Sequence, residues 1–122
     1  MREELRQAMI YWIKEADIDG YRIDQAYAVP KIFYDKTFKA LREIKPVFLL
    51  AETDIYHPGG IELVSKFDAT YDWPGHHLSK DIAKGRKNAN DYYKHIKRTI
   101  RLYGKDNILC LLYTSDAADD RV

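Results

Sequence analysis

The sequence predicts an α/β fold in which helices cover a parallel sheet or barrel. Segments with helical periodicity alternate with short apolar segments along most of the 122 residues, and the connections between them are short. Residues 46–52, PVFLLAE, form a nearly continuous apolar run, which is typical of a parallel strand that is covered on both faces. The order of the segments and this apolar run therefore both favour parallel strands.

Five helices are expected from apolar spacing and breaker residues, over residues 2–16, 30 to about 44, 60–66, 76–84 and 89–103. The first is expected to bury Leu5, Ala8, Met9, Trp12, Ile13 and Ala16. The second carries Pro30 in its first turn, where the missing N–H costs nothing. Its buried face is expected to consist of Tyr34, Phe38 and Leu41, with Ile44 as a further candidate. The last helix is expected to bury Tyr93, Ile96, Ile100 and Tyr103.

Three complete strands and the start of a fourth are expected, over residues 18–24, 46–52, 67–73 and 107–109. Successive side chains of a strand point to opposite faces. In the first strand, Tyr21 and Ile23 share the face that would pack under the helices. Gly20, Arg22 and Asp24 share the other face, which would then point inward and carry charge.

Composition and charge narrow the class of protein. Hydrophobic residues make up 46% and charged residues 32% of the chain, which is typical of a globular domain. The 20 Lys and Arg residues nearly balance the 19 Asp and Glu residues, so nucleic acid and an anionic membrane surface are not expected as partners. The longest apolar run has about six residues, whereas a membrane helix needs about 20. The single cysteine, Cys110, excludes an intrachain disulfide.

Two carboxylates end neighbouring apolar strands. Asp24 closes the first strand and Glu52 the second, one βα unit apart, so adjacent parallel strands would place both at one rim. In a (β/α)8 barrel, the carboxyl ends of the strands form the active site. In glycoside hydrolysis one carboxylate attacks the anomeric carbon and another protonates the leaving oxygen, at roughly 5–5.5 Å from each other in retaining enzymes. Arg22 would keep Asp24 ionised.

A purely structural explanation accounts for the same residues. Arg22 and Asp24 could form an ordinary buried ion pair, and Glu52 could end a strand only because a loop begins there. The residue pattern by itself leaves both explanations open.

The stretch DGYRIDQAYAVP, residues 19–30, followed by PVFLLAET, residues 46–53, resembles the α-amylase family of retaining α-glycoside hydrolases. Residues 20–24 match the family's strand-four motif, Gly-aromatic-Arg-hydrophobic-Asp, and Glu52 matches the acid/base Glu that ends strand five. FDATYDW, residues 67–73, resembles the strand-six region. This resemblance covers nearly all of residues 1–109. It implies a partial (β/α)8 TIM barrel, roughly strands four to six plus the start of strand seven with their helices.

By this resemblance, Asp24 is the nucleophile, Glu52 the general acid/base and Arg22 the residue that orients Asp24. The implied function is cleavage of α-glucosidic bonds in glucans or oligosaccharides by retaining double displacement. The alternatives are a transglycosylase or an α-glucosidase on the same barrel, and a non-catalytic amylase-like binding module. The presence of both carboxylates argues against the binding module. An unrelated doubly wound binding domain is disfavoured because no Gly-rich phosphate loop follows a strand.

Substrate contacts are predicted less specifically. His57, just past the acid/base, could line a sugar subsite or be a solvated loop residue. Trp73 could stack on a sugar ring or pack at the rim. Tyr27 and Ala28 stand where many α-amylases carry Lys-His for substrate and calcium, so Tyr27 is a weak substrate-binding candidate. No cofactor is expected from this segment, and calcium is left open only for a full-length protein.

Two further pairs of polar residues have structural interpretations. His76 and His77 are adjacent on an expected helix, where side chains diverge by about 100°, so they are not expected to chelate a metal together. Asp68 and Asp72 follow the strand-six pattern, and we expect them to form hydrogen bonds at the top of the barrel rather than to catalyse.

The final segment, CLLYTSDAADDRV, residues 110–122, is expected to be non-native, because residues 110–119 resemble a translated sequencing adapter. A genuine strand, ILCLLYT, followed by an acidic turn is the alternative. Residues 1–109 are expected to be a fragment of the catalytic domain, interrupted near Leu109. The family's strand-three Asn-His motif would then precede Met1, and its strand-seven His and third catalytic Asp would follow Leu109.

Overall fold

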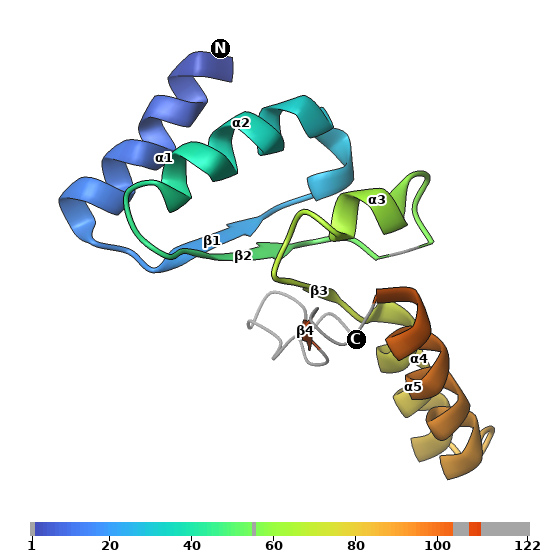
Figure 1. The fold of residues 1–122 in the computed structure, drawn as a ribbon. Helices are drawn as coiled ribbons and strands as arrows, with labels where there is room; N and C mark the ends of the chain where they lie inside the picture. The colour runs from blue at the N-terminus through green and yellow to red at the C-terminus, as the bar shows by residue number, and fades with distance from the viewer. Residues whose placement is uncertain (1, 55, 104–107, 111–122) are drawn as a thin grey trace.

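The computed structural model describes residues 2–54, 56–103 and 108–110 and shows helices alternating with short strands (Figure 1). The elements are α1 (Arg2–Ala16), β1 (Gly20–Ile23), the 3-10 helix η1 (Ala26–Ala28), α2 (Lys31–Arg42), β2 (Phe48–Ala51), α3 (Gly60–Val64), β3 (Ala69–Tyr71), α4 (Trp73–Ala83), α5 (Ala89–Tyr103) and β4 (Ile108–Cys110). This order matches the expected sequence of helices and strands.

The four strands form one sheet in the order β1-β2-β3-β4, and every neighbouring pair is parallel. In the register, Arg22 of β1 lies beside Leu50 of β2, and Leu50 lies beside Ala69 of β3. The predicted parallel α/β arrangement is therefore confirmed. Because all strands run the same way, their carboxyl ends meet along a single edge, which is where the predicted carboxylates are found.

The core lies between the sheet and α2. Tyr34, Leu41 and Leu49 are fully buried, and Phe38 and Phe67 are nearly so. The ring of Tyr34 stacks on Phe38 at 5.2 Å and meets Phe67 edge-on at 5.0 Å. The prediction is therefore correct for Tyr34, Phe38 and Leu41, whereas Ile44 lies beyond the end of α2 and is 38% exposed. Burying each of these large side chains stabilises the fold by about 1.5–3 kcal/mol.

Helix α1 buries a narrower face than its spacing predicted. Met9 and Ile13 are buried, and Ile10 packs against the same cluster, whereas Leu5 and Trp12 are about half exposed. Because successive residues of a helix turn by about 100°, this pattern means that the buried face is rotated toward Ile10. The Tyr21 hydroxyl, which donates to the Met9 carbonyl oxygen at 2.7 Å, fixes that rotation from β1.

The face predicted for α5 is wrong. Tyr93 and Ile100 are both 55% exposed, and Thr99 is buried in their place. The reason is a polar contact: His95, four residues before Thr99, binds a carboxylate at the start of α4, and this contact turns the His95 side of α5 toward α4. Ile96 is half-buried, and the side chain of Tyr103 lies outside the described part of the chain.

Two helix starts differ from expectation. Pro30 occupies the N-cap position of α2, with an extended ψ of 132°, so the helix begins one residue later. Helix α4 begins at Trp73, three residues earlier than predicted, because the Asp72 side chain accepts from the Gly75 backbone N–H at 2.9 Å and caps it. The α4–α5 hairpin extends away from the carboxyl end of β3 (Figure 1).

Candidate active site

The turn after β1 is fastened to the end of β2. Asp24 follows the last residue of β1, and Gln25 then adopts a left-handed conformation with φ 41° and ψ 52°. For a non-glycine residue this conformation costs about 1–3 kcal/mol. The Gln25 backbone N–H donates to Glu52 Oε2 at 2.9 Å, and the Ala26 N–H donates to the Glu52 carbonyl oxygen at 3.2 Å. These hydrogen bonds offset the strain and hold the two strand ends together.

The Arg22 guanidinium joins the two predicted catalytic carboxylates. Its Nη1 lies 2.9 Å from Asp24 Oδ1, and its Nη2 lies 2.7 Å from Glu52 Oε1. The side chains of Arg22, Asp24 and Glu52 are 40%, 69% and 25% exposed. Strand alternation therefore predicted the meeting of these three residues correctly, while their chemical roles remain predictions. Sequence reasoning did not foresee that one guanidinium would contact both carboxylates.

A residue outside the predicted catalytic set completes this arrangement. The Arg22 Nε donates to the Tyr71 hydroxyl at 3.1 Å, and the guanidinium carbon lies 5.8 Å from the centre of the Tyr71 ring. Tyr71 is buried at the end of β3. The strand alternation that placed Arg22 on the inner face also predicts Tyr71 on the face of Ala69, so the signal was present in the stretch FDATYDW.

The charges at the site reinforce one another. The pKa of Asp24 is lowered, first by a hydrogen bond with the Glu52 carboxyl and then by the hydrogen bond and charge of Arg22. The hydrogen bond with Tyr71 raises the pKa of Arg22, and so do the hydrogen bond with Asp24 and the charge of Glu52, whereas partial desolvation lowers it. Asp24 is therefore an anion at neutral pH, which is the form that a carboxylate nucleophile requires.

The weaker substrate candidates fall into two places. Tyr27, after β1, and His57, after β2, stack face to face with ring centres 4.2 Å apart and planes 11° apart. Tyr27 is 47% exposed, so this pair presents an aromatic surface next to the strand ends. Trp73 instead stacks on Tyr71 at 5.7 Å and is half-buried. The rim-packing interpretation of Trp73 thus describes its position better than a free stacking surface does.

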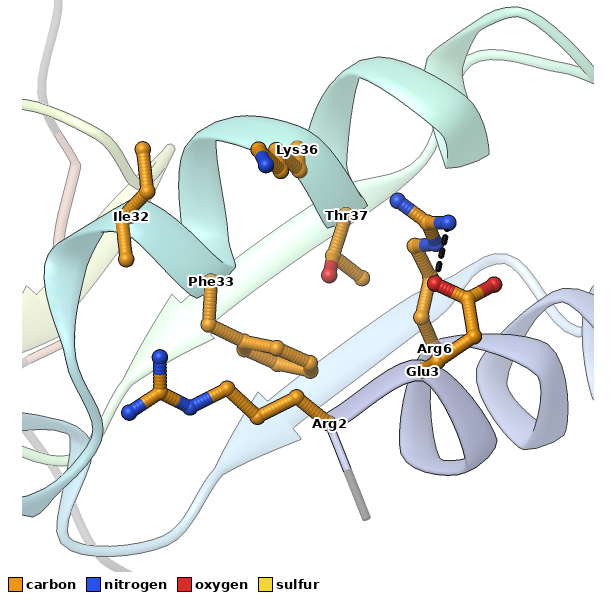
Figure 2. A pocket seen from close by; sticks show the side chains of 7 residues that line it. All are labelled: Arg2, Glu3, Arg6, Ile32, Phe33, Lys36 and Thr37. Atoms are coloured by element: carbon orange, nitrogen blue, oxygen red, sulfur yellow. Dashed lines mark hydrogen bonds and ion pairs between the residues drawn. The ribbon is translucent and has the colours of Figure 1, made fainter.

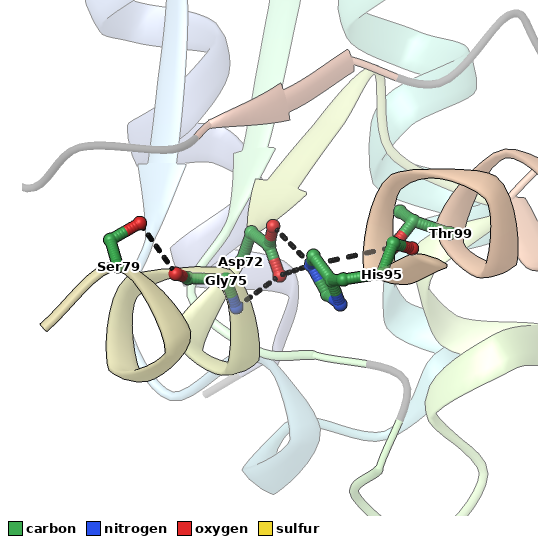
Figure 3. A network of polar contacts seen from close by, with 5 residues as sticks. All are labelled: Asp72, Gly75, Ser79, His95 and Thr99. Atoms are coloured by element: carbon green, nitrogen blue, oxygen red, sulfur yellow. Dashed lines mark hydrogen bonds and ion pairs between the residues drawn. The ribbon is translucent and has the colours of Figure 1, made fainter. Parts of the chain in front are cut away.

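Asp72 anchors the end of β3 to both following helices (Figure 3). Its Oδ1 accepts from the Gly75 N–H at 2.9 Å, and its Oδ2 lies 2.8 Å from His95 Nε2 on α5. The Thr99 hydroxyl approaches the same ring nitrogen at 3.5 Å. Asp72 therefore forms hydrogen bonds at the carboxyl end of the sheet, as predicted. The sequence pattern did not indicate His95 as the partner of Asp72, because the two residues are 23 positions apart.

The corresponding prediction for Asp68 is wrong. Because β3 begins at Ala69, Asp68 lies at the amino end of the strand, opposite to the candidate site. There its carboxylate accepts from the Leu49 N–H at 2.9 Å and pairs with Arg42 at 3.1 Å. Asp68 thus lies where the strands begin, at the edge opposite to the candidate site, and its ion pair with Arg42 connects α2 to the sheet.

A groove lies between α1 and α2 (Figure 2). It has a volume of about 350 Å³ and is lined by Arg2, Glu3, Arg6, Ile32, Phe33, Lys36 and Thr37 of α1 and α2. Arg6 is paired with Glu3 within it. The groove shares no lining residue with the strand-end carboxylates, so it is not part of the candidate active site.

Among the described residues, no three His, Cys, Asp or Glu side chains gather closely enough to hold a metal ion. The rings of His76 and His77 are 5.7 Å apart between centres and inclined by 65° to each other. In the same part of the chain, every helix is too short or too polar to span a bilayer.

Comparison with known proteins gives a consistent result, although no family profile matches the sequence. A maltogenic alpha-amylase from Bacillus acidopullulyticus is 29% identical over 109 residues, covering 84% of this chain and 18% of the relative. A cyclomaltodextrinase from Geobacillus thermopakistaniensis is 29% identical over 108 residues, covering 86% and 18%. The crystal structure of a maltogenic alpha-amylase from Thermotoga neapolitana superposes with a TM-score of 0.75 at 29% identity, over 88% of this chain and 25% of that one.

In sequence and in fold, the chain is therefore similar to alpha-amylases and cyclomaltodextrinases. It spans less than a fifth of the length of the curated relatives that it matches.

Proposed function

We propose that this chain is part of the catalytic barrel of a retaining α-glycoside hydrolase, which cleaves α-glucosidic bonds in glucans or oligosaccharides. The observation that carries the proposal is the Arg22 guanidinium, which contacts Asp24 at 2.9 Å and Glu52 at 2.7 Å at the carboxyl ends of adjacent parallel strands. That edge is where (β/α)8 barrels hold their catalytic groups. An ordinary buried Arg–Asp pair fits less well, because the Asp24 side chain is 69% exposed.

Within such a barrel, β1, β2 and β3 would correspond to strands four to six, and β4 to the start of strand seven. Residues 1–109 would form this piece of the catalytic domain, and residues 110–122 would be a non-native tail. Strand β4 ends at Cys110, one residue past that boundary. Residues 111–122, which contain the rest of the tail, lie outside the described residues.

In the first half of the reaction, Asp24 attacks the anomeric carbon while Glu52 gives its proton to the glycosidic oxygen. The bond between that carbon and the leaving oxygen breaks, and a bond to an Asp24 oxygen forms, so the sugar becomes covalently attached with inverted configuration. The lowered pKa of Asp24, caused first by Glu52 and then by Arg22, supports its role as the ionised partner.

In the second half, Glu52 accepts a proton from water, and the water oxygen attacks the anomeric carbon. The bond to Asp24 breaks, and the second inversion restores the α configuration. Arg22 would hold Asp24 in place through both steps. A transglycosylase differs only in that a sugar hydroxyl replaces this water.

The substrate proposal has its own support. The stacked pair of Tyr27 and His57 offers an exposed aromatic surface beside the strand ends, and sugar rings bind well to such surfaces. Trp73 is a weaker candidate because it packs on Tyr71. Three relatives are named cyclomaltodextrinases, which favours a cyclomaltodextrin-cleaving enzyme as a second candidate with the same mechanism.

The test uses the full-length protein that contains this chain, with soluble starch, β-cyclomaltodextrin and an activated α-glucoside as substrates. Proton NMR during the first turnovers should show the α anomer as the initial product. An initial β product would exclude double displacement. Lack of turnover of all three substrates would reject the glycosidase proposal and favour a non-catalytic module.

A further inference from the structure

The three nitrogens of the Arg22 guanidinium each have a different partner. Nη1 donates to Asp24 at 2.9 Å, Nη2 pairs with Glu52 at 2.7 Å, and Nε donates to the Tyr71 hydroxyl at 3.1 Å. The first two contacts belong to the proposed catalytic pair. The third comes from a strand that is not adjacent to the strand of Arg22.

The sheet register explains how Tyr71 reaches Arg22. Leu50 lies between Arg22 and Ala69 in one row across β1, β2 and β3, and paired residues of parallel strands share a face. Tyr71 stands two residues beyond Ala69 and therefore on the same face. Its side chain is long enough to pass over β2 and place the hydroxyl against Arg22 Nε.

Tyr71 is itself held by its surroundings. It is only 6% exposed, and its ring is stacked on Trp73 at 5.7 Å with the planes 17° apart. The next residue, Asp72, is bound to His95 on α5 and caps α4 (Figure 3). The backbone on the carboxyl side of Tyr71 is therefore tied to two helices, and the phenol ring has little freedom to move.

We propose that Tyr71 is a positioning residue, whose hydroxyl fixes Arg22 Nε so that the two Nη groups face Asp24 and Glu52 at the same time. This inference rests on the proposed function of the site. In this role Tyr71 acts through Arg22, which its hydroxyl contacts at 3.1 Å.

The reason lies in the geometry of guanidinium groups. An arginine without a partner at Nε tends to form two parallel hydrogen bonds with a single carboxylate. If Arg22 turned in that way toward Glu52, Asp24 would lose a cation that lowers its pKa. Loss of the Tyr71 hydroxyl would then raise the pKa of Asp24, although Tyr71 and Asp24 belong to strands separated by β2.

The experiment compares Tyr71→Phe with Tyr21→Phe in the full-length protein. Tyr21 is a matched control because its hydroxyl also makes one hydrogen bond, to the Met9 carbonyl oxygen at 2.7 Å, but on the opposite face of β1. For Tyr71→Phe we expect kcat to fall about 10- to 100-fold with little change in KM. We also expect the acidic limb of the kcat/KM profile to move to higher pH, since the pKa of Asp24 rises. Tyr21→Phe should leave both quantities near wild type.

A double-mutant cycle separates positioning from general damage. Arg22→Lys removes the Nε group, so adding Tyr71→Phe to that variant should change kcat by less than about twofold. Thermal melts of all variants identify any loss of folding. The inference is overturned if a folded Tyr71→Phe protein matches Tyr21→Phe in kcat and in pH profile, or if its effect persists fully beside Arg22→Lys. Failure of the proposed function has a different signature, namely a wild-type protein that turns over none of the three substrates or an Asp24→Asn protein that retains wild-type turnover.

Discussion

The Gln25 backbone N–H donates a 2.9 Å hydrogen bond to Oε2 of Glu52. This contact joins the residue after the proposed nucleophile to the proposed acid/base. The other Glu52 oxygen is held by Arg22 at 2.7 Å, so both oxygens have fixed partners. The left-handed backbone of Gln25 is what aims its N–H at Glu52, and the strain of that turn therefore serves the site.

The backbone of Gln25 can be tested with two substitutions. Gln25→Gly keeps the N–H and accepts a positive φ without strain, so kcat/KM should stay within about twofold of wild type and the free energy of unfolding should rise by up to about 1 kcal/mol. Gln25→Val resists a positive φ, so kcat/KM should fall about tenfold or more. Kinetics with an activated α-glucoside and urea unfolding provide the measurements. Equal behaviour of the two variants would show that the turn does not position Glu52.

The proposed roles of the carboxylates predict different outcomes for their amides. Asp24→Asn removes the nucleophile, so we expect turnover to fall by at least about 10³-fold. Glu52→Gln removes the acid/base, so its loss should be smaller with substrates whose leaving group needs no proton. The matched control is Asp35→Asn, which breaks the ion pair between Asp35 on α2 and Lys66 and should remain active. Activity of Asp24→Asn comparable to that of Asp35→Asn would contradict the assignment.

Gly20 is required by the close approach of β1 and β2. A Cβ atom on this residue would lie 1.9 Å from the Phe48 carbonyl oxygen, a backbone atom that cannot move aside without breaking the strand pair. Gly20→Ala should therefore lower the free energy of unfolding by more than about 2 kcal/mol.

Gly85→Ala is the comparison for that substitution. Gly85 has a φ of +70° but nothing within 4 Å of an added Cβ, so its cost should be limited to about 1 kcal/mol from the backbone conformation. Urea unfolding of both variants in the full-length protein measures the difference. A Gly20→Ala protein as stable as Gly85→Ala would mean that the strands can separate at this point without penalty.

Alkaline pH should weaken the core through Tyr34. Burial raises the pKa of Tyr34 from its ordinary value of 10.0 to about 12, and its hydroxyl donates to the Ala26 carbonyl oxygen at 2.7 Å. Since the folded pKa lies above the unfolded one, this stabilisation is complete below pH 10 and is lost as the pH rises toward 12. Chemical unfolding of the wild-type full-length protein at several pH values from 9 to 12 should show that decline.

Tyr34→Phe isolates this contribution. The variant should be less stable than the wild type at pH 7 by about 1 kcal/mol, because one buried hydrogen bond is lost. It should also lose less stability than the wild type between pH 10 and pH 12. Parallel declines in the two proteins would assign the alkaline effect to other groups.

Strand order and the meeting of Asp24 with Glu52 were predictable, because they follow from local periodicity and from the rule that parallel strands end at one edge. The predictions that failed concern positions that are set by contacts between residues far apart in the sequence. His95 binds Asp72 across 23 positions, and that contact exposes Tyr93 and buries Thr99. In the same way, Arg42 and the Leu49 N–H hold Asp68 at the opposite end of the sheet from its predicted place. Helical spacing alone carries no information on such partners.

Because we propose that this chain is part of a barrel, we expect the 122 residues to be inactive and poorly folded by themselves. A barrel closes by pairing its first strand with its last, whereas β1 and β4 are the outer strands of the described sheet. Outer strands present unpaired N–H and C=O groups that promote aggregation. The inner face is also uncovered, since Phe48 is 45% exposed and Leu50 is only half-buried.

Removing residues 110–122 should not restore folding, because the proposed tail stands in place of barrel sequence instead of blocking it. Expression of residues 1–109 and of the 122-residue chain, followed by size-exclusion chromatography, circular dichroism during heating and a starch assay, tests this prediction. We expect aggregated or broadly melting protein without measurable hydrolysis from both. Arg22 and Asp24, which are 40% and 69% exposed in their side chains, would then face water in place of the enclosed site that strengthens electrostatic catalysis. A soluble monomer that melts cooperatively and hydrolyses starch would refute the fragment interpretation.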